Sequence, residues 1–121
     1  MSHPFFALGF ALLLVHEMDA VRLGEWKIFP WLSGMGEEAG YRAFTALHVP
    51  LYALLLFGLL GGDGVGRALI VGLDAFFVVH VVLHWVYRNH PENRFGSAFS
   101  WVLILGAGAC GTADLLFSLQ S

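Results

Sequence analysis

The sequence predicts an all-α integral membrane protein, a bundle of four helices, from three observations. Hydrophobic residues fill 58% of the 121 positions and charged residues only 12%, whereas a soluble domain is roughly 45–50% apolar and about 25% charged. The mean hydropathy is +0.73. Four windows are long and apolar enough to cross a bilayer, which takes about 20 residues per helix. We therefore expect a single transmembrane domain over residues 1–121.

The same composition excludes other classes of protein. The apolar content is too high for a disordered chain. A net charge of −3 without a basic patch argues against a nucleic-acid partner. Cys110 is the one cysteine in the sequence, which excludes an internal disulfide and every metal or redox motif that needs several cysteines.

The four helices are expected at residues 4–21, 40–60, 67–87 and 96–119. A glycine-rich turn separates the second from the third, and a polar segment with a proline separates the third from the fourth. The first helix reaches spanning length because we count His16 to Asp19 inside it. Pro50 is expected to kink the second helix and to free a backbone carbonyl.

The connection between the first two helices, residues 23–38, contains Trp26 and Trp31. Because tryptophan favours the headgroup layer, we expect this connection to be a short interfacial segment. The last helix is expected to pack closely against the others, since small residues let helix backbones approach in a membrane. These small residues are Gly106, Ala107, Gly108, Ala109, Gly111 and Thr112.

Basic residues predict the orientation. Five of them flank the first and third connections, and Arg67 alone lies on the other side. The five are Arg22, Lys27, Arg42, Arg88 and Arg94. Since cytoplasmic loops carry the excess of Lys and Arg, both termini are expected outside, N-out and C-out.

Histidines on three helices are expected at a similar depth. His16 and His48 each lie six residues from the arginine at the cytoplasmic end of their helix, which places them roughly 9 Å deep. His84 and His80 lie four and eight residues before Arg88, at roughly 6 and 12 Å. Ionisable groups inside a membrane span face the bundle interior and pair with one another, so we expect these histidines to converge in the cytoplasmic half.

The spacing of these residues predicts a metal site. His80 and His84 lie one turn apart on one helix face, and His16 and Asp19 have the i, i+3 spacing. With His48 they form a set of five candidate ligands, arranged as in helix-bundle metal sites. A nitrogen-rich site of this kind favours a divalent transition metal, zinc or iron, with copper as a further option.

Glu17 points roughly 100° away from its neighbour His16, so we expect it at a second position beside the ligands, as a catalytic acid or base or as a further ligand. Structural explanations stay open beside this hypothesis. His48 can bond the backbone loosened by Pro50, and the acidic residues can pair with Arg22. In one alternative, the ionisable residues of the cytoplasmic half form a metal-free polar core. In another, this layer of residues holds haem b between two axial histidines.

Four further ionisable residues fall outside this layer. Asp74 lies near the middle of the third helix, where a proton or ion relay residue is expected. Asp114 is expected to extend toward the outer headgroups. His3 and His90 are expected to be exposed, at the terminus and in a turn.

The motifs resemble those of small uncharacterised bacterial four-helix membrane proteins. They are His16-Glu17-Met18-Asp19-Ala20, Glu25-Trp26, His48-Val49-Pro50 and His80-x-x-x-His84. The pattern is also distantly similar to the HXXEE-type membrane proteins, although Asp19-Ala20 stands where that motif has two glutamates. The resemblance implies a multi-pass protein of the bacterial inner (cytoplasmic) membrane with a shared histidine and acid site, and it implies no reaction.

The sequence therefore favours a multi-pass membrane metalloprotein whose cytoplasmic-side site acts on a lipid-soluble substrate. Three alternatives remain: a haem or quinone electron carrier, an ion or metal transporter, and an accessory subunit of a membrane complex. Because a chain of four spans has almost no soluble part, we expect lipid and either a second copy or another membrane protein as its partners.

Overall fold

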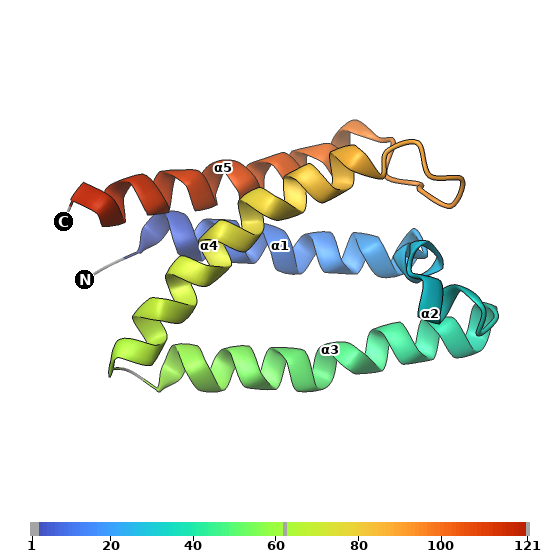
Figure 1. Ribbon diagram of the computed structural model, residues 1–121, viewed down its shortest axis with the longest axis horizontal. Coiled ribbons are helices and arrows are strands. Elements are labelled where there is room, and N and C mark those ends of the chain that lie inside the picture. The colour runs from blue at the N-terminus through green and yellow to red at the C-terminus, as the bar shows by residue number, and fades with distance from the viewer. Residues whose placement is uncertain (1–2, 62, 121) are drawn as a thin grey trace.

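The computed structural model describes residues 3–61 and 63–120, and these parts form helices with no strand (Figure 1). The elements are α1 (Pro4–Arg22), η1 (Glu25–Ile28), α2 (Pro30–Ser33), α3 (Glu37–Leu60), α4 (Asp63–Val86) and α5 (Ala98–Gln120). α1, α3, α5 and α4 from Val65 onward are each long and apolar enough to cross a membrane. The expected all-α class is confirmed, and α3 and α4 begin three and four residues before their expected starts.

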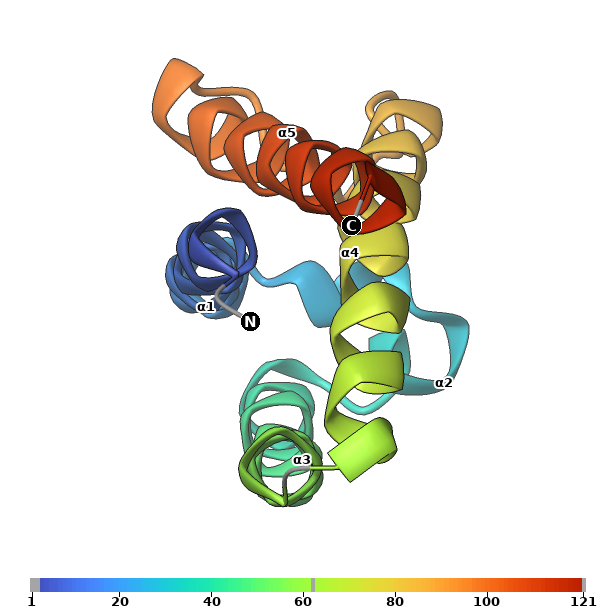
Figure 2. The same ribbon diagram turned by 90° about the vertical axis from the view of Figure 1, so that its left-hand side faces the viewer.

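The four long helices are packed unevenly. α1 and α5 lie side by side and run in opposite directions, so both chain ends are at the same end of the bundle (Figure 1). α4 crosses diagonally from the end of α3 to α5, while α3 stands apart from the other helices along most of its length (Figure 2). α5 is therefore the helix that both α1 and α4 pack against.

Small residues bring α5 close to its neighbours. A Cβ atom added at Gly111 would lie 2.7 Å from the backbone oxygen of Asp74 and 3.0 Å from Cβ of Phe77, both in α4. On the side of α1, a Cβ added at Gly9 would lie 2.9 Å from Cβ of Cys110. These distances are below ordinary van der Waals contact, so the packing role expected for the last helix is confirmed.

The connection between α1 and α3 turns back toward the helices. α1 ends at Arg22, and Gly24 adopts the left-handed conformation with φ of 67°, which glycine reaches without a steric penalty. Pro30 occupies the first position of α2, where its missing N–H is tolerated. The chain is thereby folded so that Glu25 and Trp26 face the bundle.

The two tryptophans in the connection between α1 and α3 differ in burial, and Trp26 packs inside the protein. Its side chain is 6% exposed and packs against Phe44 of α3, with ring centroids 6.2 Å apart. It also covers Gly40, where any larger residue would collide with the indole. Trp31 is 70% exposed and remains compatible with an interfacial position. Trp26 thus helps to hold the connection against α3.

Two ionisable residues near the chain ends also differ from expectation. Asp114 was expected to extend outward, yet it is buried in α5 and lies 3.0 Å from Nδ1 of His3. His3, expected to be exposed, is mostly covered by this contact. His90 lies partly buried in the α4–α5 connection, where its Nδ1 accepts the backbone N–H of Glu92. A buried carboxyl group needs a partner, and the N-terminal segment supplies one.

The close approach of α5 to α4 gives a direct test. We expect Gly111→Ala to destabilise the fold by about 1–3 kcal/mol, because the new methyl group would overlap the backbone of α4. Thermal unfolding in detergent measures the change. Gly72→Ala is the matched control, since a Cβ at Gly72 meets nothing within 4 Å and alanine favours helix over glycine. Equal effects of the two substitutions would contradict this packing.

Candidate metal centre

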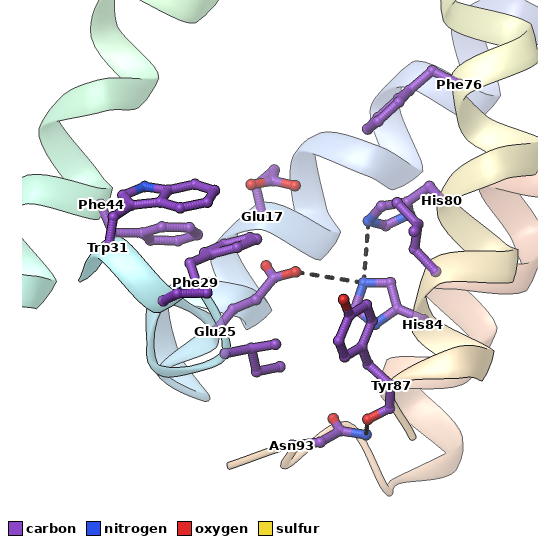
Figure 3. A pocket seen from close by; sticks show the side chains of 13 residues that line it. Glu17, Glu25, Phe29, Trp31, Phe44, Phe76, His80, His84, Tyr87 and Asn93 are labelled. Atoms are coloured by element: carbon purple, nitrogen blue, oxygen red, sulfur yellow. Dashed lines mark hydrogen bonds and ion pairs between the residues drawn. The ribbon is translucent and has the colours of Figure 1, made fainter. Parts of the chain in front are cut away.

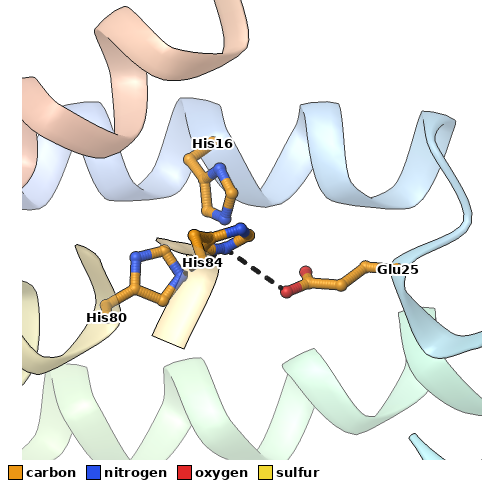
Figure 4. A group of neighbouring side chains, drawn as sticks. All are labelled: His16, Glu25, His80 and His84. Carbon is orange, nitrogen blue, oxygen red and sulfur yellow. Dashed lines mark hydrogen bonds and ion pairs between the residues drawn. The ribbon is translucent and has the colours of Figure 1, made fainter. Parts of the chain in front are cut away.

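Three histidines and one glutamate converge at a single point (Figure 4). His16, His80, His84 and Glu25 each offer one ligand atom, and these four atoms all lie within 4.8 Å of one another. The residues come from α1, α4 and η1, so segments far apart in the sequence build the cluster. Three imidazoles and a carboxylate form a donor set that divalent transition metals favour.

The distances suit one ion in the middle of the cluster. Nε2 of His84 lies 3.1 Å from Nε2 of His80 and 3.6 Å from Oε1 of Glu25. A tetrahedral ion with Zn–N bonds of about 2.0–2.1 Å keeps its ligand atoms roughly 3.3 Å apart. The ring of His16 lies edge-on to those of His80 and His84, with centroids 4.7 and 4.9 Å away. Small side-chain adjustments therefore allow all four atoms to bind together.

Local structure explains how each ligand reaches the cluster. His80 and His84 are one turn apart on α4, so both project from the same face of that helix. His16 projects from the buried face of α1. Glu25 follows the left-handed turn at Gly24, which reverses the chain and places the carboxylate beneath the end of α1.

The cluster is buried and its polar atoms are incompletely paired. His16 is fully buried, and neither of its ring nitrogens has a hydrogen-bond partner. Nδ1 of His80 is likewise buried and without a partner. Within residues 3–61 and 63–120, no lysine or arginine forms an ion pair with the cluster. Buried polar atoms normally find a partner, and a cation would supply one to a single nitrogen of each imidazole and to the carboxylate of Glu25.

The electrostatic environment of Glu25 also favours a bound cation. Burial, together with the nearby charge of Glu17, raises the pKa of the Glu25 carboxyl to about 8. An uncompensated carboxylate is therefore unfavourable at this position. A bound divalent cation would reverse this effect, because it favours the ionised carboxylate.

One side of the cluster is closed and the other is open. The ring of Phe95, which is 2% exposed, packs on His16 and His84 with centroids 5.3 and 4.7 Å away. On the opposite side, His80 and His84 reach a cavity of about 590 Å³ (Figure 3). Its other lining residues are Glu17, Glu25, Ile28, Phe29, Pro30, Trp31, Phe44, Phe76, Leu83, Tyr87 and Asn93. The cavity is thus lined mostly by apolar side chains, and the carboxylate of Glu25 points toward His84 (Figure 3).

Glu17, which lines the cavity, forms a separate pair with His48 of α3. Oε2 of Glu17 lies 2.6 Å from Nε2 of His48, and Nδ1 of His48 lies 2.7 Å from the backbone oxygen of Phe44. A carbonyl only accepts hydrogen bonds, so Nδ1 of His48 carries the donated proton. Nε2 of His48 and the carboxyl group of Glu17 can then form a hydrogen bond only if one of these two groups also carries a proton. The pair accordingly stores a transferable proton.

The structure groups the expected site residues in a different way. His16, His80 and His84 lie together in the cluster, whereas His48 is paired with Glu17. Asp19 faces α5 and accepts a hydrogen bond of 2.6 Å from Oγ of Ser100. Asp19 and His48 are therefore outside the group of four.

Glu25 joins the cluster, although it was not among the ligands expected from the sequence. Those ligands were chosen from residues inside the expected spans, and Glu25 lies in the connection between α1 and α3. A signal was present in the sequence, because an acidic residue and a buried tryptophan directly follow a glycine at the end of a helix. This arrangement is typical of a chain that turns back on itself.

Comparison with known proteins gives one match. Neither the search of curated proteins nor the search of solved structures found a match to this chain. The model of the family described as "Family of unknown function (DUF6713)" matches residues 2–121. Because this match spans nearly the whole sequence, the chain belongs to the DUF6713 family.

Proposed function

We propose that this protein is an integral membrane metalloprotein that binds one divalent transition metal ion and acts on a lipid-soluble molecule. One observation carries the proposal: three buried histidines and Glu25 offer four ligand atoms within 4.8 Å of one another. A cluster of this kind inside an apolar bundle is unfavourable unless its members pair or bind a cation.

The donor set favours zinc or iron, with copper as a further option. Three imidazole nitrogens and one carboxylate oxygen suit these ions, whereas magnesium and calcium prefer oxygen ligands. Haem b is less well supported by this geometry. His80 and His84 approach each other to 3.1 Å on one helix, and axial haem ligands need the space of a porphyrin between them.

The cavity supports a lipid-soluble substrate. Its volume of about 590 Å³ falls in the range of roughly 300–1,000 Å³ that is usual for small-molecule sites. Phe29, Trp31 and Phe44 line one wall, while His80 and His84 lie across from them. An apolar molecule with one polar end would place that end at the metal centre and its chain among the aromatic rings.

Glu17 and His48 are suited to acid–base chemistry on such a molecule. Glu17 lines the cavity, and its hydrogen bond to His48 holds the shared proton next to the substrate space. When bound, the metal ion would polarise a substrate oxygen or activate a water molecule. Glu17 would then pass a proton to or from the reacting oxygen, and His48 would restore it.

The location of the protein is also part of the proposal. The excess of basic residues around the first and third connections supports an N-out, C-out orientation. The metal centre then faces the cytoplasmic half of the bilayer, and a bacterial inner membrane fits the resemblance to small four-helix proteins and to the HXXEE type. Exposed apolar side chains such as Leu54 and Phe57 on α3 suit contact with lipid or with a second copy.

Metal content is the first test. Protein purified in detergent is expected to bind a single zinc or iron ion per chain, measured by elemental analysis before and after reconstitution. Substituting alanine for His16 or His84 should remove a ligand and lower the affinity. The loss should exceed the roughly 10–100-fold that follows the removal of an outer-shell partner.

Two other histidines serve as controls for this measurement. His90→Ala changes a residue in the α4–α5 connection, and His48→Gln changes a residue paired with Glu17. Both variants should keep the metal content of the unmodified protein. Circular dichroism of each variant separates loss of metal from loss of fold. A metal content near zero that stays unchanged after reconstitution would contradict the proposal.

Ligand binding in the cavity is the second test. A brominated long-chain alcohol should quench the fluorescence of Trp31 in a saturable manner, because Trp31 lines the cavity. Trp31→Phe should remove this saturable quenching. Ile28→Phe should fill part of the space and weaken binding about ten-fold, which corresponds to about 1.4 kcal/mol. Leu54→Phe, which alters an exposed position of α3 outside the cavity lining, is the control.

Quenching that rises with the probe concentration without saturating, and equally in Ile28→Phe, would show simple partition into the detergent. This outcome would contradict the proposed substrate class and leave the metal measurement unaffected.

A further inference from the structure

A second buried polar group lies in α4, away from the metal centre. Asp74 is 0% exposed, and neither of its carboxyl oxygens has a hydrogen-bond donor as partner. It is six residues before His80, roughly 9 Å along the helix, and it is absent from the residues that line the cavity. A buried carboxyl group without a partner is unfavourable in an apolar bundle, so the surroundings of Asp74 need an explanation.

Another buried carboxyl group lies at the same contact between α4 and α5. Asp114 of α5 is 2% exposed and follows Gly111 by one turn, and a Cβ atom added at Gly111 would lie 2.7 Å from the backbone oxygen of Asp74. Oδ2 of Asp114 also lies 3.0 Å from Nδ1 of His3, whose side chain is 15% exposed. A continuous row therefore leads from the surface through His3 and Asp114 to Asp74.

No basic side chain balances the two acids from the neighbouring helices. Within residues 3–61 and 63–120, His3 is the basic partner of Asp114, and no lysine or arginine pairs with either acid. Arg67 is on α4 itself, two turns before Asp74, and is exposed. On α5 the other titratable side chain in this stretch is Cys110, one turn before Asp114.

The remaining surroundings of Asp74 are apolar. Phe77, one turn further along α4, forms a buried apolar cluster with Phe6 and Leu13 of α1, and Leu73 of α4 packs against this cluster. Two carboxylates cannot both remain ionised at close range in such surroundings. Two carboxyl groups are also both acceptors, and they hydrogen-bond only when one of them carries a proton.

We propose that Asp74 is a proton-binding site, a neutral carboxylic acid that donates its O–H to Asp114 and exchanges its proton with the surface through Asp114 and His3. A metal ion fits this group less well. In the described parts of the chain, the group of three or more ligand atoms within 4.8 Å is the histidine cluster. His3, Asp74 and Asp114 do not converge in that way, whereas a proton needs contact only between successive members of a row.

The exchange needs two proton transfers. Protonated His3 passes the proton on Nδ1 to Oδ2 of Asp114, which leaves His3 neutral and Asp114 a neutral acid. Asp114 then transfers its proton to the ionised carboxylate of Asp74 and becomes a carboxylate again. Water at the bundle end where both chain termini lie returns a proton to His3 (Figure 1). This site does not depend on the proposed metal function.

Infrared spectroscopy tests the proposal directly. Protein in detergent at neutral pH, labelled with carboxyl-13C aspartate, should show a carboxylic-acid C=O band that is shifted by the label. Asp74→Asn should abolish this band. Asp114→Asn should shift it, because the acid then bonds to a different partner. Asp19→Asn is the matched control and should leave the band in place, since Asp19 accepts its hydrogen bond from Ser100.

A second readout follows the route of the proton. After transfer into D2O, the band should shift on deuteration, and His3→Phe should slow this shift. Three results would overturn the proposal: no aspartic-acid band in the unmodified protein, a band that Asp74→Asn and Asp114→Asn both leave unchanged, or conversion of the band to a carboxylate signal on addition of sodium or zinc. If Asp74→Asn fails to fold, the spectra of the unmodified protein and of Asp114→Asn still decide the question.

Discussion

The close contact of α5 with both α1 and α4 is the constraint on which the rest of the structure depends. α1 and α4 touch each other little, and each packs mainly on α5. Gly108 and Gly111 allow the backbone of α4 to approach, and Gly9 of α1 allows the matching approach on the other side. This arrangement holds His16 against His80 and His84. Packing of small residues thus determines where the ionisable residues can meet.

With α1 and α4 packed on α5, the ionisable residues separate into groups along the bundle. Three histidines and Glu25 meet beneath the end of α1, and Glu17, which lines the cavity, pairs with His48. Asp74 and Asp114 are buried where α4 meets α5, and Asp114 pairs with His3. In an apolar medium each group must neutralise its own charge. A metal ion, a shared proton and a neutral acid are three ways of doing so.

The long helices, and the depth of the ionisable side chains along them, could be predicted from the sequence. Both follow from the rise of a helix and the thickness of a bilayer. The helices and the convergence of His16, His80 and His84 follow from these two quantities. The direction in which each helix faces does not follow from these two quantities. α3 stands apart from the bundle, so His48 at the expected depth reaches Glu17 rather than the other histidines.

Contacts made outside the spans were also beyond prediction. Glu25 enters the cluster because a left-handed glycine reverses the chain after α1. Asp114 is buried in α5 and finds a partner in His3, which precedes α1. Both contacts depend on how a connection or a terminus packs against the helices, and hydropathy along the sequence carries no information about that packing.

X-ray absorption at the metal edge of the purified, metal-loaded protein identifies the ligands of the bound ion. We expect a first shell of three imidazole nitrogens at about 2.0–2.1 Å together with carboxylate oxygen, with the multiple scattering that imidazole rings produce. A shell of oxygen alone, without imidazole scattering, would contradict the assignment of His16, His80, His84 and Glu25 as the metal ligands.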